Sequence, residues 1–244
     1  ELGLQPSDLI GISPPGSRHL RGLSLTPGAL ASLGDDGQAT YLFRPVADPS
    51  TAARRYIASG EDLDVDTAYK CRVRKPWWRV PYLKPADLFL TYMNADTPRL
   101  STNRAGVHHL NSVHGVYLSD QHRNLGRSLL PIASLNSVTL LSAETVGRAY
   151  GGGMLKLEPR EADNLAMPAP TLLERYRGDL TALKPKVLGA LRGGHLLDAV
   201  RLVDEVLLSR GLRLSKGSLN AIRADHVALT SRRMARAKET HRGE

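Results

Sequence analysis

The sequence contains one cysteine, Cys71, among its 244 residues. A single cysteine excludes an intrachain disulfide and a cysteine-rich zinc site, and it is typical of a reducing compartment. No segment approaches the roughly 18 consecutive apolar residues that span a bilayer, and the first residues lack the basic and apolar regions of a signal peptide. These absences predict a cytoplasmic protein with no membrane partner.

Aromatic residues are also scarce, at 5% of the chain, so the pairing of Trp77 with Trp78 is informative. A hydrophobic content of 41% is enough for one good core, or for one core and a smaller helical appendage. The first residue is Glu1 and not Met, which favours a fragment or a processed product over a complete coding sequence.

The net charge of +9 predicts a polyanionic partner if the charge is concentrated. Residues 1–67 have a net charge of −4, so this part is not the expected anion site. Residues 68–110 have a net charge of +6, residues 111–200 of +2, and residues 201–244 of +5. Two basic blocks therefore hold the excess, and the first is the denser.

Turn signals dominate the first third, as in Ser13-Pro14-Pro15-Gly16 and Gly34-Asp35-Asp36-Gly37, and predict loops and short elements. Five later segments have the composition of strands and together predict a sheet core over about residues 69–157. These segments are Tyr69–Val73, Leu88–Met93, Val113–Leu118, Val138–Leu141 and Met154–Leu157.

After Pro168-Ala169-Pro170 the apolar spacing becomes helical, and Thr171 and Glu174 have capping-box spacing. Gly193-Gly194 ends this block, a second helix is expected over about Leu196–Ser209, and a third near Ser215. The predicted fold class is α+β, a mixed sheet-containing domain followed by a helical subdomain. The expected boundaries are 1–168 for the sheet-containing domain and 169–244 for the helices.

The first candidate site is the cationic segment from Lys70 to Arg79. If residues 69–74 are extended, Lys70, Arg72 and Arg74 share one face about 7 Å apart, a spacing that suits successive phosphates. Paired tryptophans are more often packing anchors than ligand contacts. The basic residues favour nucleic-acid contact, and the predicted site is Lys70, Arg72, Arg74, Lys75, Trp77, Trp78 and Arg79.

The second candidate site is rich in side chains that suit base edges or phosphates: Asn103, Arg104, His108, Asn111 and His114. Three histidines close together raise the alternative of a metal site. However, no acidic residue lies between Arg99 and Tyr117, and adjacent histidines on a strand point to opposite faces. We therefore expect no metal here and favour a structural or DNA-contacting role.

The third candidate site is the run Gly151-Gly152-Gly153 after Tyr150, with Arg148 and Lys156 on either side. Three glycines mark a tight turn or a place where the backbone approaches a ligand closely. A phosphate is a reasonable ligand, although the run fits no nucleotide-binding fingerprint, and a plain hairpin turn is the alternative. We expect the turn to face DNA beside the cationic segment.

The chain resembles the C-terminal target-recognition region of bacterial adenine-specific DNA methyltransferases in which the catalytic domain comes first. The order and spacing of motifs agree over most of the chain. The segments that support the resemblance are Tyr56–Glu61, Tyr69–Arg72, Trp77–Pro81, Asp87–Leu90, Pro98–Leu100, Leu135–Ser137 and, most specifically, Gly147–Pro159.

The resemblance implies sequence-specific recognition of duplex DNA across a cleft completed by an N-terminal catalytic domain, which flips an adenine and methylates it. The family's glycine-containing loop for S-adenosylmethionine and its Asn/Asp/Ser-Pro-Pro-aromatic motif are not found in this sequence. The nearest match, Ser13-Pro14-Pro15-Gly16, has glycine in place of the aromatic residue. We therefore expect this chain alone to be inactive and without a cofactor.

Two alternatives stay open. One is a free-standing DNA- or RNA-binding specificity subunit that serves a separate catalytic chain. The other is a nuclease, for which Glu158 beside Lys156 is the nearest feature, although no convergent set of carboxylates is evident.

Overall fold

The computed structural model describes residues 2–240, which form two compact units. Unit 1 comprises residues 2–15, 27–86 and 105–110, and unit 2 comprises residues 16–26, 87–104 and 111–240. Helices and three small sheets occur together, so the predicted α+β class is confirmed. The functional division expected at residue 168 stays a prediction; residues 169–240 belong to unit 2, as do most of the strands.

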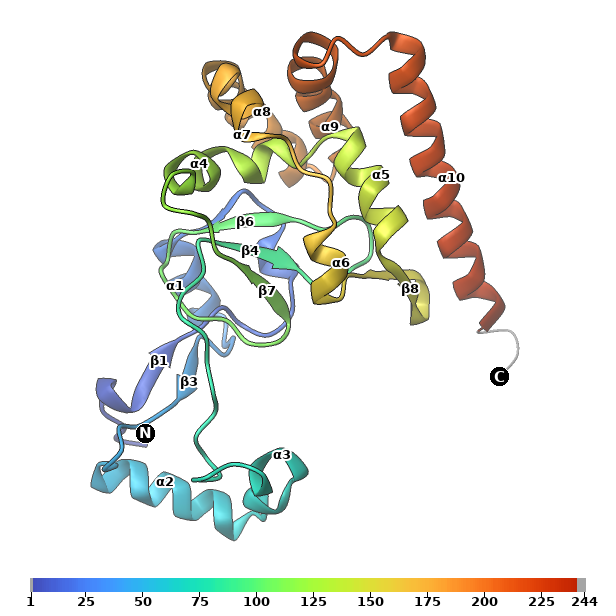
Figure 1. The fold of residues 1–244 in the computed structure, drawn as a ribbon. Helices are drawn as coiled ribbons and strands as arrows, with labels where there is room; N and C mark the ends of the chain where they lie inside the picture. The colour runs from blue at the N-terminus through green and yellow to red at the C-terminus, as the bar shows by residue number, and fades with distance from the viewer. Residues whose placement is uncertain (1, 241–244) are drawn as a thin grey trace. The chain divides into compact units, whose positions relative to one another are not determined.

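A four-stranded sheet lies at the centre of unit 2, in the order β2 (Ser24–Leu25), β6 (Leu100–Asn103), β4 (Leu88–Thr91) and β7 (Val113–Val116) (Figure 1). β4 is antiparallel to both neighbours, with Phe89 opposite Ser101 and Gly115. All four residues of β4 are buried. The nearly continuous apolar run Leu88-Phe89-Leu90 suits a strand that is covered on both faces.

A second sheet of unit 2 has the order β5 (Met93–Asn94), β9 (Met154–Lys156) and β8 (Arg148–Tyr150). The short helix η4 (Gly151–Gly153) joins β8 to β9, and these two strands are antiparallel. Gly147, just before β8, has no room for a side chain, because a Cβ there would lie 2.8 Å from the Ala143 carbonyl oxygen. The glycine therefore allows β8 to start directly at the end of a helix.

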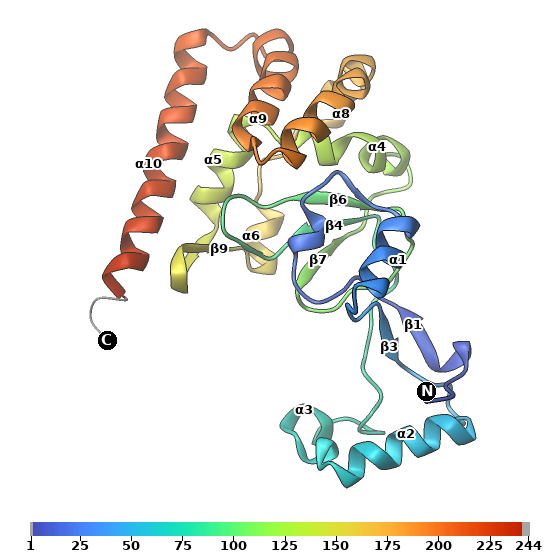
Figure 2. The same cartoon turned by 180° about the vertical axis from the view of Figure 1, so that it is seen from behind.

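Helices complete unit 2 (Figure 2). Buried side chains such as Leu129, Ile132, Leu180 and Val203 form one core with them. The elements are α4 (Arg123–Ala133), α5 (Ser137–Val146), α6 (Pro159–Asp163), α7 (Pro170–Arg175), α8 (Arg177–Arg192), α9 (Leu196–Asp204), the π-helix η5 (Glu205–Gly211) and α10 (Lys216–Thr240).

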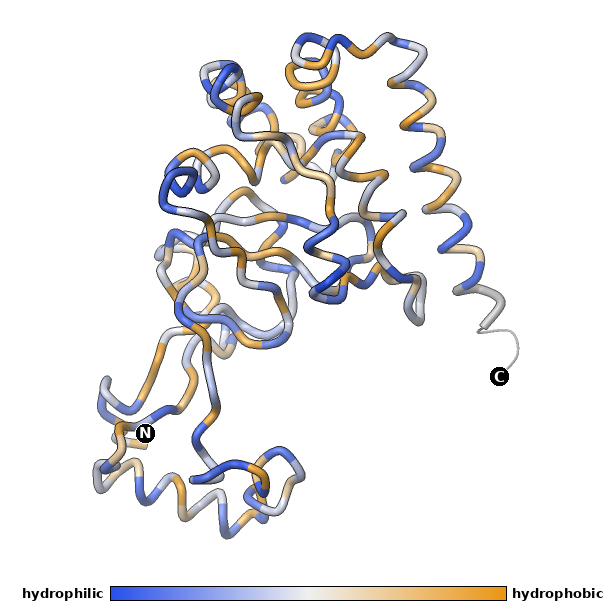
Figure 3. Tube along the Cα trace, in the orientation of Figure 1, coloured by the Kyte–Doolittle hydropathy of each residue, from blue (hydrophilic) through white to orange (hydrophobic). Residues whose placement is uncertain are grey.

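α10 lies beside α5 in both views, and hydrophilic positions dominate it (Figures 1 and 3). Near its start, Arg223 donates to the buried carboxylate of Asp204, with Nη2 at 2.7 Å from Oδ2. The same carboxylate accepts from the backbone N–H and the hydroxyl of Ser137. A buried charge needs such partners, so this cluster fixes α10 against α5 and α9.

No single helix among the described residues is long and apolar enough to cross a membrane. α4 and α5 together pass by length and composition, but they meet at an angle of 87°. Leu129 and Ile132 of α4 and Leu140 of α5 lie in the core of unit 2.

Unit 1 has a two-stranded sheet of β1 (Leu9–Gly11) and β3 (Tyr41–Phe43), together with α1 (Pro27–Asp35), α2 (Thr51–Asp62), η3 (Val65–Thr67) and α3 (Tyr69–Arg72). The prediction of only loops and short elements in this part missed α1 and α2. α2 begins at an N-cap that was not considered: the Ser50 hydroxyl accepts a hydrogen bond from the N–H of Ala53 at 3.1 Å.

The predicted strand Tyr69–Val73 is wrong, because residues 69–72 form α3. The N–H groups of Cys71 and Arg72 donate to the carbonyl of Ala68 at 2.8 and 3.0 Å. A strand needs a neighbouring backbone for its hydrogen bonds, whereas a helical turn satisfies them locally. Lys70, Arg72 and Arg74 therefore do not form the expected alternating row.

The predicted strand Val138–Leu141 is also wrong, because these residues lie in α5. The Asn136 side chain accepts from the N–H of Thr139 at 2.9 Å and caps the helix. A cap of this kind outweighs the strand propensity of β-branched Val138 and Thr139. The strands expected over 88–93, 113–118 and 154–157 are confirmed by β4 and β5, β7 and β9.

The helices expected after residue 168 are confirmed, including the end at Gly193-Gly194 and the start near Ser215. The predicted capping box of Thr171 and Glu174 is wrong. Pro170 occupies the first turn of α7 with Ala169 as the N-cap, and Glu174 instead pairs with Arg177. Proline suits the first helical position because its φ is fixed near the helical value, so the helix begins before Thr171 and leaves this residue inside the first turn.

Candidate nucleic-acid interface

A run of cations without carboxylate partners marks unit 1. Within the described residues no ion pair forms at Lys70, Arg72, Arg74, Lys75 or Arg79. In unit 2, by contrast, many arginines pair with an acid, as Arg177 does with Glu174 and Arg201 with Asp198. Unpaired cations that are close together in sequence repel one another, and an external anion relieves that repulsion.

The two tryptophans of this segment are half-buried. Trp77 Nε1 donates to Glu61 Oε1 at 2.9 Å, and its ring fills the space above Gly60, where a Cβ would lie 2.7 Å from the ring. The Trp78 ring lies 6.4 Å from that of Phe43. These contacts indicate that both tryptophans are packing anchors and not base-stacking platforms. This is also the role that large aromatic residues have more often in general.

His108 takes part in a second feature of unit 1. Its ring meets the ring of exposed Tyr82 edge-on at 4.6 Å, and the Arg44 guanidinium lies 4.4 Å from the centre of the same tyrosine ring. His108 Nδ1 donates to the carbonyl of Leu83 at 2.7 Å. Arg44 and Tyr82 were not predicted as part of this feature, because they lie far from His108 in the chain.

The polar residues predicted around position 103 differ in exposure. Asn103 lies in β6 and is only 1% exposed, so DNA cannot reach its side chain in this conformation. Arg104 and Asn111 are exposed. Burial, and after it the positive charge of Arg104, lowers the pKa of Lys184 in α8. Lys184 was missed because it is 80 positions away.

The glycine turn is an exposed feature of unit 2. Gly152 and Gly153 have φ of +69° and +73°, a conformation that favours glycine, and Gly151 and Gly152 are exposed. A Cβ at Gly152 would meet no atom within 4 Å. The backbone conformation thus explains the glycines at 152 and 153, and the open space leaves the main chain accessible to a ligand.

The two cations beside the turn are already paired. Arg148 pairs with Glu161, and Lys156 Nζ lies 2.7 Å from Glu158 Oε1. The hydrogen bond to Glu158, and then that to Tyr92, raises the pKa of Lys156 well above its usual range. Arg148 and Lys156 are therefore not the free phosphate-binding charges that were expected beside the turn.

Aromatic rings instead gather around Lys156, whose Nζ lies 5.0 Å from the ring centre of Tyr150 and 5.3 Å from that of Tyr92. The Tyr92 ring also meets His114 edge-on at 5.1 Å, and His114 Nε2 donates to the carbonyl of Leu157 at 2.7 Å. Three predicted residues, His114, Tyr150 and Lys156, are thus brought together. We call these residues with Tyr92 the Lys156 group.

Tyr92 and Glu158 were missed as members of this site. The Tyr92 hydroxyl lies 3.1 Å from both carboxylate oxygens of Glu158. The sequence spacing could have indicated Glu158. Residues two apart on an extended segment share one face, so Glu158 lies on the same face as Lys156. No comparable spacing connects Tyr92 to position 156; the pairing of β5 with β9 makes that link.

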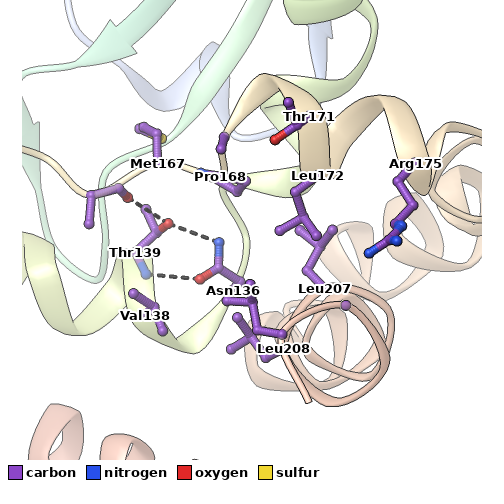
Figure 4. Close-up of a pocket in the computed structure, with 14 residues that line it drawn as sticks. Asn136, Val138, Thr139, Met167, Pro168, Thr171, Leu172, Arg175, Leu207 and Leu208 are labelled. Atoms are coloured by element: carbon purple, nitrogen blue, oxygen red, sulfur yellow. Dashed lines mark hydrogen bonds between the residues drawn. The ribbon is translucent and has the colours of Figure 1, made fainter. Parts of the chain in front are cut away.

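A pocket of about 530 Å³ occurs elsewhere in unit 2, between the start of α5, residues 166–169 and η5 (Figure 4). Apolar side chains such as Leu172, Leu207 and Leu208 line much of it. Its polar residues Asn136 and Thr139 bond one another, as the dashed lines in Figure 4 show. Over residues 2–240, no group of three or more His, Cys, Asp or Glu side chains is arranged to hold a metal ion.

Comparison with known proteins decides the family. A family model described as the C-terminal domain of the type II methyltransferase M.Eco57I matches residues 1–208. The chain belongs to this family. The predicted resemblance to the C-terminal region of a DNA methyltransferase is confirmed.

Two relatives agree with membership of the M.Eco57I C-terminal family. Type II methyltransferase M.XamI of Xanthomonas campestris pv. amaranthicola is 34% identical over 107 residues, 43% of this chain and 19% of the relative. Type II methyltransferase M.AccI of Acinetobacter calcoaceticus is 24% identical over 143 residues, 58% of this chain and 26% of the relative. The matches thus span about a fifth to a quarter of the relatives' lengths. No solved structure matches the chain.

Proposed function

We propose that this chain recognises duplex DNA sequence-specifically, as the C-terminal part of an adenine-specific DNA methyltransferase that uses S-adenosylmethionine. The observation that carries the proposal is the run of unpaired cations from Lys70 to Arg79 in unit 1. Membership in the M.Eco57I C-terminal family supports it.

The cations of unit 1 suit the phosphates and not the bases. Each cation that contacts a phosphate releases a condensed counterion, so affinity falls as the salt concentration rises. Such contacts orient a protein on the duplex but discriminate little between sequences. In this proposal unit 1 therefore supplies affinity, and sequence discrimination requires other side chains.

Unit 2 supplies candidates for discrimination. Tyr150 is 56% exposed, and the Lys156 group places donors, acceptors and ring faces beside the accessible backbone of Gly151 and Gly152. Base edges are distinguished by such mixed donors and acceptors in the grooves. The paired state of Lys156 and Arg148 fits a role in shape and orientation better than one in neutralising phosphates.

S-adenosylmethionine and adenine flipping belong, in this proposal, to an N-terminal catalytic domain. When bound there, the cofactor supplies the methyl group. The pocket of Figure 4 is a poor match for this cofactor, because Asn136 and Thr139 already use their polar atoms within the protein. Thr171 and Arg175 are the other polar side chains of its lining, whereas a zwitterionic nucleoside needs several polar partners. We therefore derive no methyl-transfer step through residues of this chain.

Selection from a pool of randomised duplexes tests the proposal. We expect the chain to enrich a motif that contains adenine, with affinity that falls steeply with salt. The intact methyltransferase should then methylate adenine within the same motif. Absence of enrichment, or binding that does not respond to salt, would contradict the proposed recognition role.

A further inference from the structure

Arg233 connects α10 to the glycine turn. Its side chain is 4% exposed, and its Nη1 donates to the carbonyl of Gly153. Nη2 lies 3.3 Å from the carbonyl of Asp96, in the segment that follows β5. One guanidinium therefore contacts two backbone segments of the sheet formed by β5, β9 and β8, the residues after β5 and the turn between β8 and β9.

Glu144 of α5 holds the same guanidinium in place. Arg233 Nε donates to Glu144 Oε2 at 2.9 Å, and Nη2 donates to Oε1 at 2.7 Å. The Thr230 hydroxyl donates to Oε1 at 3.0 Å, and the Glu144 side chain is only 2% exposed. A two-point pair of this kind fixes the plane of the guanidinium as well as its position.

The turn needs such a partner. Gly152 and Gly153 have no Cβ, so their own conformational preferences restrict the connection between β8 and β9 weakly. The bond from Arg233 to the Gly153 carbonyl selects one conformation of this connection. Tyr150 and Lys156 lie on its two sides, so their positions depend on the same bond.

The family model ends at residue 208, whereas α10 begins at Lys216. The contact therefore comes from a part of the chain that lies outside the match to the family. We propose that Arg233 is a positioning residue for DNA discrimination, which acts by holding the glycine turn and through it the Lys156 group. This inference rests on the proposed recognition of DNA.

Arg233→Lys tests the inference, because lysine keeps the charge but loses the two-point geometry. Arg223→Lys is the matched control: Arg223 also ties α10 to a buried carboxylate, Asp204, and its described hydrogen bonds go to Asp204 and Ser137 and not to the turn. The quantity to measure is the ratio of affinities for a selected duplex and for the unselected pool. Hydrogen exchange at Gly151–Gly153 reports the turn itself.

We expect Arg233→Lys to lower this ratio about tenfold, the size of one lost base-pair discrimination, and to speed exchange in the turn. Arg223→Lys should leave both unchanged even if it lowers the melting temperature equally. Should Arg233→Lys fail to fold, Glu144→Gln loosens the same pair and must give the same loss.

An unchanged ratio in a folded variant with a loosened turn would overturn the positioning role. In that case the wild type still prefers its selected duplex, so the proposed function stands. If the wild-type chain binds all duplexes equally well, both the positioning role of Arg233 and the proposed function are overturned.

Discussion

At the scale of single residues, the cations from Lys70 to Arg79 differ from most arginines of unit 2 in having no described carboxylate partner. An exposed ion pair contributes little to stability, so its absence costs the fold little. Such side chains are available for phosphates. Their effect should therefore appear in binding and not in folding.

The double substitution Arg72→Ala with Arg74→Ala should weaken binding to all duplexes alike. The slope of log affinity against log salt should fall by about 0.9 for each lost phosphate contact. Titrations of a labelled duplex over a range of salt concentrations measure both quantities.

Arg177→Ala with Arg201→Ala is the control, since it removes the same net charge from two exposed ion pairs. It should leave the slope unchanged. A folded Arg72/Arg74 variant with wild-type affinity would show that these residues do not contact phosphates.

Trp77→Ala should instead lower the free energy of unfolding by about 2–3 kcal/mol, somewhat less than the loss expected for a fully buried tryptophan.

At the scale of elements, the turn between β8 and β9 combines a backbone conformation that favours glycine with an open surface. Gly152→Val forces a β-branched residue to φ near +69°, which costs about 1–3 kcal/mol. We expect this substitution to reduce DNA binding more than its loss of melting temperature explains, since the side chain also blocks the approach of a ligand.

Gly194→Val is the control for this prediction. Gly194 has φ of +76° and the same open space around a Cβ, but it lies between α8 and α9. Equal losses of DNA affinity from both variants, measured together with their melting temperatures, would mean that the glycines serve only the backbone.

The carboxylate of Asp87, just before β4, accepts hydrogen bonds from Arg123 and Arg127 of α4 and has a shifted pKa. Burial alone raises the pKa of Asp87, but hydrogen bonds from the Leu118 N–H, Arg127 and Arg123 outweigh it, and the pKa lies below its usual value. A lowered pKa contributes stability that is present above the unfolded-state pKa of about 3.9 and is lost as the pH falls through the folded value.

Asp87→Asn should therefore lower the free energy of unfolding at pH 7 by about 1.5–3 kcal/mol, the range for hydrogen bonds to a charged group. The difference from the wild type should shrink as the pH falls below about 4. Urea unfolding at a series of pH values checks this. A difference that stays constant down to pH 3 would assign the loss to packing.

The sequence alone predicts an element well when its residue pattern is enough to identify it. It predicts an element poorly when the outcome depends on hydrogen-bond partners far away in the chain. β4, β7 and β9 were predictable because their apolar or alternating residues match a buried strand. Residues 69–73 have similar composition, yet no neighbouring strand pairs with them. Asn136, which caps α5, was a local signal for the start of a helix. The β-branched Val138 and Thr139 after it favoured a strand, and the prediction followed them.

At the scale of the whole molecule, the candidate site was predictable only where its residues are close in sequence. Arg148, Tyr150 and Lys156 meet across one hairpin. Tyr92, Lys184 and Arg233 reach their partners through sheet pairing and helix packing, which single-sequence patterns do not encode. The place of the glycine turn relative to the cations of unit 1 stays a prediction.

We also predict that the chain as given neither binds S-adenosylmethionine nor transfers methyl groups, because the sequence lacks the cofactor loop and the adenine-holding motif of the family it resembles. Calorimetric titration with the cofactor should show no saturable heat at micromolar concentrations. Saturable binding would place a cofactor site within these 244 residues.

The path of the chain between its two units limits how this region can be exchanged between enzymes. The backbone passes from one unit to the other five times. β2, β4 and β6 come from residues 24–103, interspersed with most of unit 1, whereas β7 follows at Val113. A recombination event with one junction inside residues 27–103 therefore divides the four-stranded sheet between two parents. New specificities in this region should arise by substitution of side chains, or by replacement of both units together.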